Sequence, residues 1–212
     1  MSVSVTEYID SFIVDVNNTI NWKYLKSRRV LKKEINDIVF QIDFYSSKFN
    51  STGSRIEIKS ECRVWCRKYD KSLTVKSGIA DIAFMEDKGC WWDIRDADNR
   101  NTVLHSLLQE INAKVIRFTM KMENDFKSGL LNLICDYGFS AYSNSMQYID
   151  ETFGREEVLA AANEYMKNMS VSEQKMIGRF MNGENDLVNE RNLRYMIDYH
   201  LIDTKDQILA GD

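Results

Sequence analysis

Two segments in the first third of the chain alternate apolar and polar residues with a period of two, and this pattern restricts the fold more than any other feature. The even positions of the first segment are apolar: Ile38, Phe40, Ile42 and Phe44. Most even positions of the second segment are apolar too: Ile56, Ile58, Cys62, Val64 and Cys66. Because successive strand side chains point to opposite faces, we expect two strands, each with one buried side and one solvent-facing side, as in antiparallel sheets.

Shorter patterns extend this sheet. Residues 46–54 have the composition of a turn that joins the two strands. Further strands are expected over residues 79–85 and 90–94, and an edge strand over residues 29–35. We therefore expect four or five antiparallel strands.

A helical pattern precedes the strands. Ser4 and Glu7 have the spacing of a capping box, in which a hydroxyl and a carboxylate bind the free amides at a helix start. Apolar residues follow at helical spacing: Val5, Ile9, Phe12, Val16 and Ile20. The pattern predicts a helix over residues 5–19.

After the last expected strand, the apolar spacing becomes helical again. It predicts helices over residues 103–118 and 126–134. Asp98 or Asn99 is the expected N-cap of the first of them, because short polar side chains accept hydrogen bonds from the first free amides.

The last third of the chain predicts a helical extension, in which Ser170 and Glu173 repeat the capping-box spacing. The expected class is α+β: an N-terminal helix, a four- to five-stranded antiparallel sheet and C-terminal helices packed on it. We expect an α+β domain over residues 1–140 and a helical extension over residues 141–212 that packs on it. A single continuous domain is the alternative.

The cysteines do not form the pattern of a disulfide scaffold: Cys62, Cys66, Cys90 and Cys135. The first residues lack the basic and apolar blocks of a secretory signal, and every apolar stretch is too short to span a bilayer. We therefore expect a cytoplasmic protein with reduced thiols. Cys62 and Cys66 would lie about 13 Å apart along one strand, too far to share Zn²⁺, so neither a metal nor a cofactor is expected.

Charge is distributed unevenly along the chain. Residues 1–80 contain 14 Lys and Arg against 9 Asp and Glu, whereas residues 81–212 contain 14 against 23. An asymmetry of this kind can steer a charged partner, although ordinary solvated surfaces also explain it.

The middle of the chain resembles an uncharacterised bacterial domain family. The resemblance rests on the Phe-Gln strand and the Ser-Lys-Phe-Asn turn within residues 38–50, on Trp91 and Trp92, and on the helix that opens near Val103. It covers roughly residues 5–140 and implies an α+β fold and a bacterial source. The strand at residues 55–59 lacks the family's aromatic start and its Asn-Leu-Gly continuation, and no motif of the resemblance contains an obligate catalytic residue.

Three charged residues suggest one enzymatic alternative. Asp43 on one strand, with Glu57 and Lys59 on the next, resembles the Mg²⁺-binding core of restriction-type nucleases. The alternation places all three on one face. Ordinary cross-strand charge pairing on a solvated face explains the same residues without any chemistry.

The polar side of the two strands also combines aromatic and arginine residues, which are typical of binding hot spots: Gln41, Tyr45, Arg63, Trp65 and Arg67. Such a surface could also stack single-stranded nucleic acid, but the acidic chain lacks a dense basic run and argues against it. If the helical extension covers this side, Trp65 instead belongs to a second core.

The sequence thus favours a non-catalytic protein-binding domain, because no nucleophile, base or cofactor loop is evident. One specific form is an immunity or antitoxin-like protein whose acidic helical half complements a basic effector. The alternative is the Mg²⁺-dependent nuclease.

Overall fold

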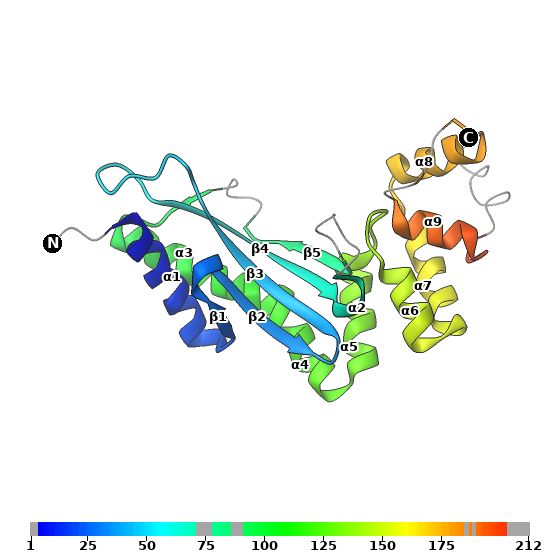
Figure 1. Cartoon of the computed structure of the whole chain (residues 1–212), viewed down its shortest axis with the longest axis horizontal. Helices are drawn as coiled ribbons and strands as arrows, with labels where there is room; N and C mark the ends of the chain where they lie inside the picture. Colours follow the sequence, from blue (N-terminus) through cyan, green and yellow to red (C-terminus); the bar gives the residue numbers. More distant parts are fainter. Residues whose placement is uncertain (1–3, 71–77, 86–90, 185–186, 188–189, 203–212) are drawn as a thin grey trace.

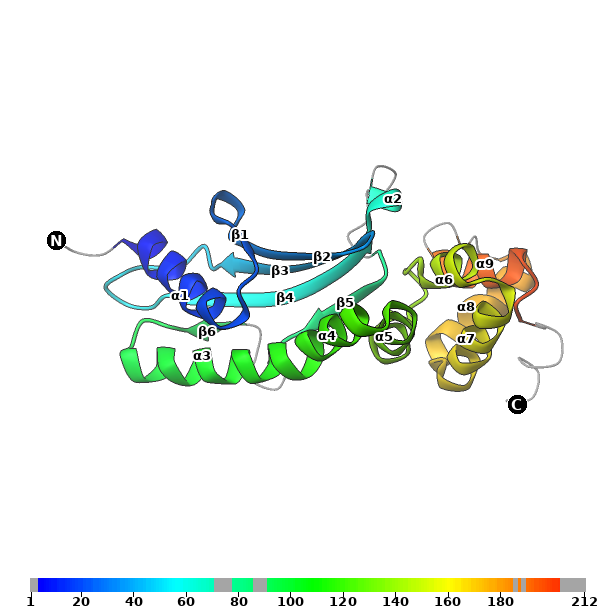
Figure 2. The same ribbon diagram turned by 90° about the horizontal axis from the view of Figure 1, so that it is seen from below.

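The computed structural model describes residues 4–70, 78–85, 91–184, 187 and 190–202. Within them, six strands form one antiparallel sheet. Five follow the order β1-β2-β3-β4-β5 (Figure 1), and β6, labelled in Figure 2, pairs with β4 next to β5. The strands are β1 (Lys23–Leu25), β2 (Val30–Ile35), β3 (Ile38–Ser46), β4 (Glu57–Cys66), β5 (Ala80–Ala83) and β6 (Trp92–Asp93). The fold is therefore α+β, as expected.

Helices cover one face of this sheet (Figure 2). α3 (Ala97–Ile111) continues through a π-helical segment (Asn112–Ile116) into α4 (Arg117–Asn124), and α5 (Phe126–Leu133) packs against α4. α1 (Val5–Ile20) packs against α3. No helix in the described part of the chain is long and apolar enough to cross a membrane.

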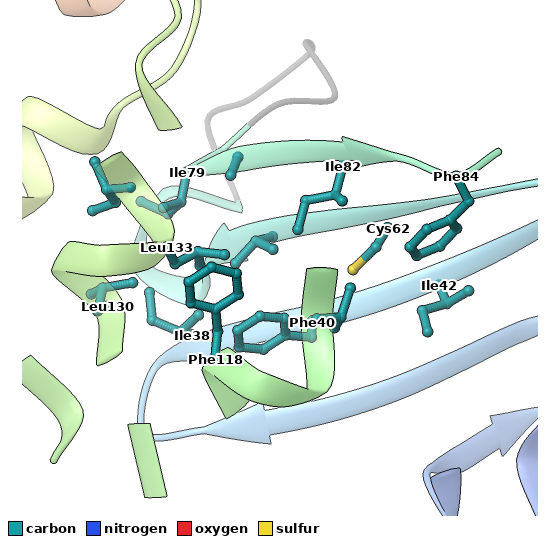
Figure 3. Packing of buried hydrophobic residues seen from close by; sticks show 14 of the residues in the cluster. Ile38, Phe40, Ile42, Cys62, Ile79, Ile82, Phe84, Phe118, Leu130 and Leu133 are labelled. Atoms are coloured by element: carbon teal, nitrogen blue, oxygen red, sulfur yellow. The ribbon is translucent and has the colours of Figure 1, made fainter. Parts of the chain in front are cut away.

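The main core lies between the sheet and these helices. Even-numbered side chains of β3 and β4 point into it, where Phe40 and Cys62 are buried in one cluster with Phe118 and Leu130 (Figure 3). Gly129 permits the close contact of α4 with α5, because a Cβ atom there would lie 2.5 Å from the backbone nitrogen of Met122.

The first helix agrees with its prediction, whereas the cap of the third does not. α1 begins after Ser4, and both hydrogen bonds of the capping box with Glu7 are present. The N-cap of α3 is Asp96, not Asp98 or Asn99, because the Asp96 carboxylate accepts the backbone amides of both these residues. Asp98 and Asn99 belong to the first turn of α3, because the helix starts at Ala97, before the apolar pattern that predicted it.

The two long strands and the turn between them are confirmed, but the edge of the sheet differs from the prediction. β2 was expected to be the edge strand, but β1 pairs with its outer side and places Lys23 opposite Lys32. Three residues are too few for a period-two pattern, which is why the sequence did not indicate β1. Cys90, expected to open the last strand, lies outside the described residues.

The helices after Gly138 lie beyond the end of the sheet where β4 runs into the short helix α2 (Arg67–Asp70) (Figures 1 and 2). They are α6 (Ser145–Phe153), α7 (Arg155–Asn168), α8 (Val171–Met181) and α9 (Arg191–Asp198). They do not lie over the second face of the sheet, so the described helices leave this face open. We call it the open face; it consists of the odd-numbered residues of β1, β3, β4 and β5 and the even-numbered residues of β2.

Polar contacts hold this helical extension together and attach it to the sheet. The side chain of Asn192 in α9 is fully buried, donates to the Ser143 hydroxyl at 2.7 Å and accepts from the Met146 amide at 3.0 Å. The Tyr148 hydroxyl of α6 donates to Asp37, in the β2–β3 turn, at 2.6 Å. Because buried polar groups are costly to leave unpaired, the Asn192 bonds join α9 to the start of α6 within the extension. The Tyr148 bond ties the extension to the end of the sheet.

We predict that replacing the two adjacent tryptophans has unequal effects on the free energy of unfolding. Consecutive strand residues face opposite ways, and Trp92 is 4% exposed whereas Trp91 is 42% exposed. Trp92→Ala should lower the free energy of unfolding by about 3–5 kcal/mol through the cavity it leaves. Trp91→Ala, the matched control, should change it by only about 0.5 kcal/mol. Urea unfolding measures both, and equal losses would contradict this assignment of the core.

Candidate functional site

The open face carries a row of polar residues that crosses all five consecutive strands. The strand register places these residues side by side: Lys23, Lys32, Gln41, Arg63 and Asp81. No helix among the described residues lies across this row (Figure 2). Its polar groups must therefore be satisfied by one another, by solvent or by a partner.

Asp43 is the centre of a hydrogen-bonded cluster on this face. Arg63 donates through Nε and Nη2 to its Oδ2 at 2.9 and 2.8 Å, and Gln41 donates to its Oδ1 at 2.8 Å. Asp43 is 7% exposed, so a charge that would be costly alone is paired. Burial lowers the pKa of Arg63, but its hydrogen bonds to Asp43 outweigh this and raise the pKa overall. Arg63 therefore stays ionised.

A second pair lies beside the first. The Tyr45 hydroxyl donates to Glu61 at 2.7 Å, and Glu61 lies directly opposite Asp43 across the two strands. Burial and the bond to Glu61 raise the pKa of Tyr45 far above its usual range. Tyr45 therefore stays protonated and keeps a fixed orientation at physiological pH.

Trp65 forms the aromatic part of the open face. It pairs across the strands with the fully buried Val39, and the Lys32 ammonium lies 5.5 Å from its ring centroid. Gly78 allows the chain to pass close by, because a Cβ there would lie 2.5 Å from the Trp65 Cβ. The indole Nε1 is buried and donates to no group in the described part of the chain. Trp65 is therefore half-buried and held by packing on this face, which the described helices leave uncovered.

Arg67 lies at the end of this surface. It begins α2, just after β4, and its guanidinium pairs with Glu34 of β2. The structure therefore brings the five predicted binding residues together along the open face, at its centre and at its α2 end: Gln41, Tyr45, Arg63, Trp65 and Arg67.

The three residues of the nuclease alternative share the open face but do not converge. Asp43 lies opposite Glu61, which is four residues from Glu57 along β4, or about 13 Å at strand rise. Glu57 pairs instead with Arg55 at 3.2 Å, and Lys59 lies opposite Tyr45. The described residues contain no group of three or more His, Cys, Asp or Glu that could hold a metal ion. This arrangement lacks the carboxylate geometry that two-carboxylate Mg²⁺ chemistry requires.

Lys32 and Asp81 were not among the predicted binding residues. The sequence of β2, Val-Leu-Lys-Lys-Glu-Ile, has no clear alternation that would assign Lys32 to a face. The signal that could have assigned it is the two-residue turn Asn36-Asp37, in which Asn36 has a φ of 54°, a conformation that asparagine tolerates. A turn of this length places Ile35 opposite Ile38. That pairing fixes the register and therefore the side of Lys32.

Comparison of the chain with protein-family models, with curated proteins and with solved structures gave no match. The resemblance noted from the sequence therefore stays a prediction. The functional argument rests on the open face itself.

We predict that Asp43 stabilises the fold whereas Glu57 does not. Asp43→Asn leaves the partly buried Arg63 without its counter-charge and should cost about 1–3 kcal/mol in the free energy of unfolding. Glu57→Gln, the matched control on the same face, removes a more exposed ion pair and should cost under about 0.5 kcal/mol. Chemical unfolding at pH 7 distinguishes them, and a cost at Glu57 as large as at Asp43 would contradict the account of the cluster.

Proposed function

We propose that this chain is a non-catalytic protein-binding domain and that its partner binds the open face. The observation that carries the proposal is a sheet face that the described helices leave uncovered and whose polar and aromatic side chains are already fixed by their neighbours. Arg63 and Tyr45 are each held by hydrogen bonds within the face, and Trp65 is held by packing. Binding would then cost little side-chain entropy, and Trp, Tyr and Arg are the residues that dominate interface energies.

The chemistry of the thiols supports binding over catalysis. Cys62 is fully buried, which raises the pKa of its thiol far above the usual value. Burial is also the main cause that raises the pKa of Cys66 to about 11. Thiols of this kind are poor nucleophiles at neutral pH. The free thiols of Cys62, Cys66 and Cys135 fit a reducing compartment, and we place the protein in the bacterial cytoplasm as part of the same proposal.

Within this class we favour an immunity or antitoxin-like role against a basic effector protein. Residues 150–212 contain 13 Asp and Glu against 7 Lys and Arg. Helices α6 to α9 lie at one end of the sheet and carry 7 of these Asp and Glu against 6 of these Lys and Arg, and Glu156 and Glu157 occupy the first turn of α7. The other acidic residues of this range lie outside these helices. A basic effector docked on the open face near α2 would be attracted by this acidic extension, which raises the rate of association.

The experiment compares capture of a partner by the tagged chain of residues 1–212 and by variants of its open face. Trp65→Ala should reduce capture about 30-fold, because central aromatic hot spots contribute about 2 kcal/mol or more. Since Trp65 also packs on Val39, Glu57→Gln provides a second variant, because it removes an acidic group of the open face that a basic effector would contact. It should weaken capture while leaving the free energy of unfolding nearly unchanged.

The control is Met120→Ala on α4. Met120 is 57% exposed and belongs to the helical layer on the other side of the sheet. It should retain full capture. If both open-face variants still capture the partner and Met120→Ala does not, the result contradicts the proposal.

A further inference from the structure

A pocket of about 530 Å³ with a mixed polar and apolar lining lies at the corner where α1, the β1–β2 connection and the end of β3 meet. α1 contributes Thr6 and Asp10, and β3 contributes Ser46. The connection contributes Lys26–Arg28, a short 3₁₀ turn, and the following Arg29. The volume lies within the range of ligand sites for small molecules.

Cations outnumber anions in the lining of this pocket. Lys26, Arg28 and Arg29 face a single carboxylate, that of Asp10. Arg29 Nε donates to Asp10 Oδ1 at 3.3 Å, and Lys26 Nζ lies 3.9 Å from Oδ2. Arg28 makes no ion pair within the described residues. The formal charge of the lining is therefore two positive, and Asp10 serves to hold two of the cations in place.

Phe44 and several hydroxyl groups complete the lining. Ser46 Oγ accepts a hydrogen bond from Asn50 at 3.2 Å, so its own proton remains available to a ligand. Thr6 and Ser27 add two more hydroxyls. Tyr45 lines the pocket as well, but its proton is committed to Glu61. Guanidinium and hydroxyl donors around one space are the groups that bind the oxygens of a tetrahedral anion.

We propose that this pocket binds the phosphate group of a small phosphorylated molecule. The two positive charges match a phosphomonoester, which carries nearly two negative charges at neutral pH, better than a carboxylate with one. The space exceeds what a single phosphate fills, so the rest of the ligand occupies the remainder. The site shares only Tyr45 with the open face, and it is tested on the isolated chain without any protein partner.

The test is calorimetric titration at constant ionic strength with inorganic phosphate, glycerol phosphate and acetate. We expect both phosphates to bind and acetate not to bind, with glycerol phosphate the tighter of the two. Arg28→Gln should weaken phosphate binding at least tenfold, because it removes a charge-assisted donor from an exposed position without touching the core. Lys121→Gln, an exposed lysine of α4 far from the pocket in sequence, is the matched control and should bind as the unaltered chain does.

Three results of the titration would overturn the proposal. The first is that neither phosphate binds, and the second is equal phosphate binding by the unaltered chain and by Arg28→Gln. The third is tighter binding of inorganic phosphate than of glycerol phosphate, which would assign the pocket to the free ion. Chemical-shift changes at the backbone amides of Ser27 and Arg28 on addition of phosphate would support the location, and changes confined to other elements would contradict it.

Discussion

The strict alternation of side chains along β3 and β4 is the constraint on which the other features depend. It sends Phe40 and Cys62 into the core under α3, α4 and α5, and it sends Asp43 and Arg63 to the opposite face. A slip of one residue would exchange the two sets, bury the charges and expose the core. The turn at Asn36 prevents such a slip, because it pairs Ile35 with Ile38.

The described helices cover only one side of the sheet, and charged groups of the other side are paired within the sheet itself. The bonds from Arg63 to Asp43 and from Tyr45 to Glu61 do this between neighbouring strands. They also give the open face a defined shape before any partner arrives. The same local pairing keeps Asp43 and Glu57 in separate contacts, which is why two carboxylates on one face do not form a metal site.

Local patterns were sufficient to predict α1, β3, β4 and the sides of their residues, since periodicity and capping boxes act within a few positions. Such patterns could not predict the register of β3 with β4. They placed Asp43 and Glu57 on one face of the sheet but could not show how far apart the two residues lie along the strands. The location of the helical extension depends on contacts between residues far apart in sequence, such as Tyr148 with Asp37. Asp96 was missed because the first turn of α3 carries no apolar residue at helical spacing. The pocket at Arg28 arises only when three separate segments meet.

The most direct test of the central claim is hydroxyl-radical footprinting of the free chain, read by mass spectrometry. The account predicts oxidation of Trp65 and Tyr45 on the open face, with Phe40 and Trp92 protected in the core. Addition of the captured partner should then protect Trp65 and Tyr45 while the exposed Met120 of α4 stays reactive. Protection of Trp65 and Tyr45 in the free chain would contradict the account, because it would show that another part of the chain already covers this face.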